Sequence, residues 1–287
     1  MFFERISSGY ELALSSWHVL RQNKKLIVFP VLSGMACMLV LLGFAAPFLV
    51  HPQWLDFLDA NARGGVHPPI WSYAVLFVYY FCNYFVITYF NAALISCAII
   101  SFNGGQPTLA DGIGAANGRL PQIFAWALVS ATVGVLLKLL ENIHERLGAI
   151  VSAILGMGWS ILTFFVVPVL VVEKVGPFEA ISRSTAILRR AWGESLVSRW
   201  GIGLFMFLLA LPGVVLLVIG VMLWTQALAL GIGVLALAGL YLLALMAIGP
   251  TLNGICLAAL YQYAADGHVP PAFDSNLLSG AFTRKSK

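Results

Sequence analysis

The sequence predicts an all-α fold, a polytopic membrane protein with six transmembrane helices. Two observations lead to this fold class. Of the 287 residues, 60% are hydrophobic and only 10% are charged, which is more apolar than a water-soluble fold of this length needs to be. The apolar residues also gather in six long stretches, and about 20 residues of α-helix cross the hydrocarbon of a bilayer. We therefore expect the bilayer to be the solvent for most of the chain.

The six predicted spans cover residues 26–50, 70–100, 123–140, 150–172, 201–223 and 229–264. The second and the sixth are longer than the membrane is thick, so they should tilt or project into water. We expect the sixth to bend or break near Pro250, because proline cannot continue the hydrogen-bond pattern of a helix.

The lysine and arginine residues lie mostly on one side of these spans. Positive charge resists translocation, so this side should be cytoplasmic. The opposite side carries only Arg63, Lys138 and Arg146. We therefore predict a multi-pass protein of the cell (inner) membrane with both termini, including a tail at 265–287, in the cytoplasm. No cleavage motif follows a short apolar core near the start, so we expect no signal peptide. The basic residues are spread beside several spans, which argues against nucleic acid as a partner.

Three segments on the predicted cytoplasmic side begin alike, and one precedes each pair of spans. Each has an acidic residue near its start: Glu11, Asp111 and Glu179. Ser8 and Thr108 stand three residues before their acids, which is the spacing of a capping box, and Pro177 suits a first helical turn. Apolar residues then recur at steps of three and four. We expect three amphipathic helices in the cytoplasmic interface.

This pattern predicts a possible three-fold parallel repeat of an amphipathic helix plus a transmembrane hairpin. The units would be 8–100, 107–172 and 177–264, within a single integral membrane domain at 1–287. The alternative is that any helix of the inner interface begins with an acid and ends with a base, without a true repeat.

Polar side chains within the spans form a second group of interest: Tyr80, Asn83, Tyr84, Asn91 and Asn253. They could line a path for a solute, or they could make the hydrogen bonds between helices that are common in membranes. Near the centre of the predicted spans the sequence has no Asp, Glu, Arg or His, which argues against ion-coupled transport.

The basic face of the third amphipathic segment is the candidate site for lipid. Arg183, Arg189 and Arg190 lie close to Trp192, and such a face is typical of a helix that contacts anionic headgroups. We find no cysteine and histidine cluster with metal-ligand spacing and no pairing of a nucleophile with a base, so we expect no metal site, no cofactor and no catalytic residues.

Two motifs carry a resemblance to a known family. The opening Arg5-Ile-x-x-Gly-Tyr-Glu-Leu, followed by Lys25-Leu-Ile-Val-Phe-Pro, resembles uncharacterised prokaryotic six-span integral membrane proteins, a domain of unknown function. The later Glu173-Lys-Val-Gly-Pro-Phe-Glu fits the same family and is similar to the membrane domain of some glycerophosphodiester phosphodiesterases. The resemblance implies the six-span fold and no catalytic residues. The soluble barrel of those enzymes, with its acidic metal ligands, is missing here, so their activity is not carried over.

Together these patterns favour a non-enzymatic inner-membrane protein that binds lipid or partner proteins, as a subunit or scaffold. Its partners would be membrane lipids, other subunits or further copies of itself. The alternative is a channel or facilitative transporter for a small or lipid-like solute that uses the polar side chains of the spans. An enzyme within the membrane is the third and least favoured hypothesis.

Overall fold

The structure is a computed structural model that describes residues 2–50, 70–143, 147–190, 195–224, 227–274 and 278. Every regular element in these residues is helical. Among the described residues, six helical segments are long and apolar enough to cross a membrane. They are Lys24–Pro47, Trp71–Phe102, Leu120–Glu141, Leu147–Val172, Phe205–Trp224 and Leu228–Asp266. The prediction of an all-α, six-span fold is confirmed, and the chain is a multi-pass membrane protein.

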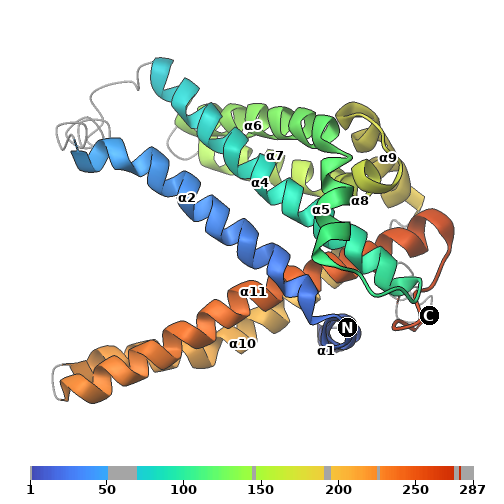
Figure 1. Cartoon of the computed structure of the whole chain (residues 1–287). Coiled ribbons are helices and arrows are strands. Elements are labelled where there is room, and N and C mark those ends of the chain that lie inside the picture. The colour runs from blue at the N-terminus through green and yellow to red at the C-terminus, as the bar shows by residue number, and fades with distance from the viewer. Residues whose placement is uncertain are drawn as a thin grey trace. The chain divides into compact units, whose positions relative to one another are not determined.

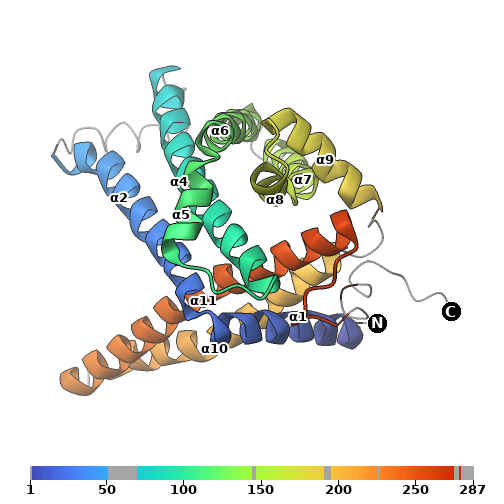
Figure 2. The same ribbon diagram turned by 45° about the vertical axis from the view of Figure 1, so that its right-hand side comes forward.

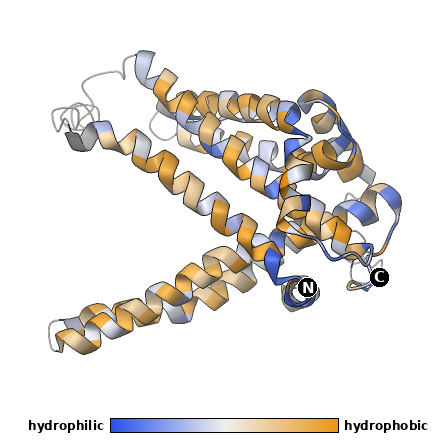
Figure 3. Ribbon diagram, in the orientation of Figure 1, coloured by the Kyte–Doolittle hydropathy of each residue, from blue (hydrophilic) through white to orange (hydrophobic). Residues whose placement is uncertain are grey.

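A less apolar helix precedes each pair of spans (Figure 1). The first group is α1 (Phe2–Gln22), the 3-10 turn η1 (Lys24–Ile27), α2 (Val28–Val50) and α4 (Ile70–Phe102). The second is α5 (Leu109–Asn117), α6 (Leu120–Ile143), α7 (Leu147–Leu162) and α8 (Val166–Val172). The third is α9 (Pro177–Arg190), α10 (Ser195–Trp224) and α11 (Leu228–Asp266). Figure 3 shows mainly apolar residues along the long helices and hydrophilic residues on α9, on the turn between α1 and α2 and at the end of α11. A symmetry relation among the three groups stays a prediction.

The observed helix bounds test the predicted capping boxes and the predicted effects of proline. The capping box before α5 is confirmed: the Thr108 amide donates to Asp111 Oδ2 at 2.8 Å, and the Asp111 amide donates to Thr108 Oγ1 at 3.2 Å. Pro177 is the first residue of α9, as predicted. The predicted capping box at Ser8 is wrong, because α1 begins at Phe2 and Ser8 lies inside it. The sixth span is not broken at Pro250, since α11 runs through this residue, and a bend there stays a prediction.

The chain divides into two compact units. The first comprises Met1–Pro30, Ala93–Gly112 and Ala186–Lys287. Within it, α10 and α11 lie side by side and α1 packs against both (Figures 1 and 2). The Tyr241 hydroxyl of α11 donates to the Leu209 carbonyl of α10 at 2.6 Å. Next to Pro250, which lacks an amide hydrogen, the Thr251 hydroxyl donates to the Ala247 carbonyl at 2.7 Å.

The second unit comprises Val31–Ala92 and Ile113–Thr185. Within it, α6 packs along α7, where Trp126 and Trp159 stack with ring centroids 5.8 Å apart. The Ser152 hydroxyl of α7 donates to the Leu137 carbonyl of α6 at 3.0 Å. The fourth span is broken between α7 and α8, a feature that the sequence did not predict.

Candidate functional site

The break in the fourth span is held by a buried serine of α9. Ser184 is fully buried. Its hydroxyl accepts a hydrogen bond from the Phe165 amide at 3.1 Å and donates to the Leu162 carbonyl at 2.8 Å. The side chain therefore bonds to backbone groups on both sides of the break. Without these bonds, the backbone groups would be buried unpaired in apolar surroundings, which costs free energy. This contact fixes the first half of α9 against the end of the fourth span.

An ion pair joins the same two elements at the membrane boundary. The Nε of Arg183 lies 2.9 and 3.0 Å from the two carboxylate oxygens of Glu173, the residue that follows α8. Nearby in this unit, Arg119 donates from Nε to the Val171 carbonyl at 3.1 Å, where its positive charge complements the carbonyl end of α8. Much of the charge of Arg183 is therefore neutralised within the protein.

The predicted headgroup-binding residues consequently differ in their surroundings. Arg183 is engaged with Glu173, whereas Arg189 is exposed near the end of α9. Arg190 is the last residue of the helix, and Trp192 lies outside the described residues. At the start of the helix, Phe178 is 75% exposed. The opposite face is buried by small and apolar residues: Ala180, Ile187 and Leu188, together with Ser184.

The structure uses several of the predicted polar span residues in packing. Tyr80 and Tyr84 meet edge to face, with ring centroids 6.3 Å apart, and both approach α6 at Gly134. A Cβ atom at Gly134 would lie 2.9 Å from the Tyr80 ring, so the glycine permits this close contact. The side-chain Nδ2 of Asn83 donates to the Tyr79 carbonyl of its own helix at 2.9 Å.

The two remaining polar residues fall in different units. Asn91 is half-buried in the second unit, and Asn253 is exposed on α11 in the first unit. The structure therefore does not describe the five residues as one cluster. Their predicted role in a solute path stays a prediction.

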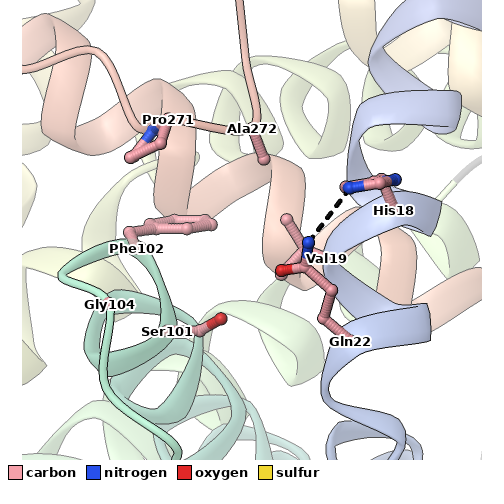
Figure 4. A pocket seen from close by; sticks show the side chains of 8 residues that line it. All are labelled: His18, Val19, Gln22, Ser101, Phe102, Gly104, Pro271 and Ala272. Carbon is pink, nitrogen blue, oxygen red and sulfur yellow. Dashed lines mark hydrogen bonds between the residues drawn. The ribbon is translucent and has the colours of Figure 1, made fainter.

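A recess in the first unit was not predicted from the sequence (Figure 4). It has a volume of about 260 Å³. Its walls come from α1, from the end of α4 and from the segment after α11: His18, Gln22, Ser101, Phe102, Pro271 and Ala272. The side-chain Nδ2 of Asn23, the residue after α1, donates to the Ser101 hydroxyl of α4 at 2.7 Å beside the recess. No pattern in the sequence could have found it, because the three wall segments are far apart along the chain.

In the part of the chain that the structure describes, no three His, Cys, Asp or Glu side chains lie close enough together to hold a metal ion. The four cysteines are free thiols, and two of them, Cys97 and Cys256, are buried.

Comparison with known proteins adds one match. Residues 70–271 match the family of unknown function DUF6159. No curated protein and no solved structure matches the chain. The resemblance of the motif at 173–179 to the membrane domain of glycerophosphodiester phosphodiesterases is therefore not supported by these comparisons.

Proposed function

The chain belongs to the DUF6159 family of unknown function, and we propose that it is a non-enzymatic membrane subunit or scaffold that binds anionic lipid headgroups through α9. The observation that carries this proposal is the surface of that helix. Phe178 exposes 75% of its surface at one end and Arg189 is exposed near the other, while the opposite face is buried. An exposed aromatic ring on a basic amphipathic helix is typical of a helix that lies in the membrane interface.

The charge distribution supports a lipid contact at the end of α9. Since Glu173 pairs with Arg183, the charge offered to a headgroup would come from the exposed Arg189 and from Arg190, which follows it in sequence. Trp192 follows them directly in sequence and would anchor this end at the headgroup level. The excess of basic residues on the same side of the spans supports a cytoplasmic location for α9 in the inner membrane.

Lipid retention measured by native mass spectrometry tests the proposal. The purified chain is released from nanodiscs of mixed phosphatidylglycerol and phosphatidylcholine, and bound lipids are counted. Each basic residue near an anionic surface contributes about 1 kcal/mol, so the double variant R189Q/R190Q should retain roughly thirtyfold less phosphatidylglycerol. The matched control R183Q removes an arginine that already has a carboxylate partner, so its effect should be much smaller. Equal phosphatidylglycerol retention by wild type and the double variant would rule out this role of α9.

The surface of α9 has a second candidate ligand, a partner protein in place of lipid. Affinity purification in a mild detergent that keeps native lipids would identify it. A protein retained in constant stoichiometry by wild type and lost from R189Q/R190Q would make α9 a protein-binding helix instead.

The channel or facilitative transporter remains the alternative function. Several of its candidate residues have structural partners: Tyr80 and Tyr84 pack on α6, and Asn83 bonds to backbone. A transport role would have to rest on Asn91 and Asn253. Solute flux in liposomes that N91L or N253L alters would favour this alternative.

A further inference from the structure

The recess between α1, α4 and the segment after α11 is already formed in the structure. The Asn23 amide donates to Ser101 on one wall. On another wall, Phe273 is only 5% exposed and packs edge to face on Phe102, with ring centroids 5.9 Å apart. The Phe273 amide donates to the Pro270 carbonyl at 2.9 Å and closes a turn there. A recess with such fixed walls needs little reorganisation to accept a ligand.

The polar atoms of the recess offer both a donor and an acceptor. Gln22 Nε2 lies 3.0 Å from His18 Nε2, so the imidazole nitrogen accepts and the amide oxygen of Gln22 is left to accept another bond (Figure 4). The Ser101 hydroxyl accepts from Asn23, which leaves its own hydrogen to donate. A ligand hydroxyl can both give and receive a hydrogen bond, so it suits this pair of groups.

The remaining walls favour an uncharged ligand with a carbon skeleton. Asp, Glu, Lys and Arg are absent from the residues that line the recess in the described structure, so a charged group would enter without a counter-charge. The Phe102 ring and Pro271 supply apolar contact. Phe102 is also the last residue of a transmembrane span, so the recess belongs to the membrane boundary, where lipid headgroups and water-soluble molecules both have access.

We propose that this recess binds a small uncharged polyhydroxylated group, a sugar or polyol, with its hydroxyls on Gln22 and Ser101 and its carbon face on Phe102. The group could be the headgroup of a membrane glycolipid or the free sugar. This site is separate from the basic surface of α9, and neither binding event requires the other.

The experiment uses the full chain in phosphatidylcholine nanodiscs with two probes. Glucosyl diacylglycerol, added to the bilayer and counted by native mass spectrometry, tests the lipid source. Free glucose, titrated by calorimetry, tests the soluble source. Binding of either probe that S101A and Q22L weaken roughly two- to tenfold supports the proposal, because this is the contribution of one neutral hydrogen bond.

Two further variants control for indirect effects. A272L leaves the bond between Asn23 and Ser101 intact but fills the recess, so it should weaken the same probe while the unfolding temperature stays that of wild type. S15A changes a serine of α1 that does not line the recess and should bind like wild type. Retention of neither probe, or binding that none of S101A, Q22L and A272L alters, would overturn the proposal. The variant R189Q/R190Q should bind the sugar normally, which separates this site from the one on α9.

Discussion

Replacing Ser184 with alanine should destabilise the second unit by about 1 to 3 kcal/mol. The substitution removes both hydrogen bonds that the hydroxyl makes across the break in the fourth span, to Phe165 at 3.1 Å and Leu162 at 2.8 Å. A hydrogen bond contributes roughly 0.5 to 1.5 kcal/mol in a protein, and those between membrane helices average near the low end of this range. Because Ser184 is fully buried, water cannot readily replace the lost hydroxyl.

Equilibrium unfolding in mixed micelles with increasing denaturing detergent measures this change. The matched control is S182A, which removes the hydroxyl of an exposed serine two residues earlier on the same helix and should change the free energy of unfolding by less than about 0.5 kcal/mol. Equal effects of S184A and S182A would refute the idea that this hydroxyl holds the broken span.

Three other tests follow from the described contacts. A Cβ atom at Gly112 would lie 2.5 Å from the ring of Phe29 in α2, so G112A should lower the unfolding free energy by about 1 to 3 kcal/mol. Gly114 lies in open space on the same helix, so the control G114A should raise the unfolding free energy by up to about 1 kcal/mol. Hydrogen bonds from Thr108 lower the pKa of Asp111, so the cap stabilises the fold at pH values above the normal titration range of aspartate. This stabilisation is lost as the pH falls from that range through the lowered pKa of Asp111. The stability difference between wild type and D111N should shrink on acidification in pH-dependent unfolding; a constant difference would exclude the cap as its cause. Finally, Y241F removes a hydrogen bond between α10 and α11 and should cost about 0.6 to 2 kcal/mol in the same unfolding assay, and an unchanged transition would contradict this.

The sequence could predict the features that depend on neighbouring residues. Long apolar stretches identify the six spans because the bilayer demands a fixed length of apolar helix. The capping box at Thr108 forms because both of its partners lie within one turn. The same spacing failed at Ser8, since the residues before it also adopt a helix and α1 begins at Phe2. A capping pattern marks a helix start only where the preceding chain is not helical.

Features that depend on distant partners could not be predicted. The apolar run of the fourth span carries no signal for its break, because the hydroxyl that bonds across the break comes from Ser184, 19 residues after Phe165. The ion pair of Arg183 could not be predicted, because its acidic partner, Glu173, is ten residues away and outside the helix. The recess likewise depends on three segments brought together by the fold.

Side-specific labelling of single cysteines tests most directly the central claim, that α1, α5 and α9 lie on the cytoplasmic side of six spans. In a background with the four native cysteines replaced by alanine, E11C, N117C and S182C place one thiol on each helix, and R63C places one in the connection between the first two spans. A membrane-impermeant maleimide applied to intact cells should label only R63C, and the other three should react only after permeabilisation. Labelling of E11C, N117C or S182C in intact cells would contradict the topology, and with it the proposed contact of α9 with the inner leaflet.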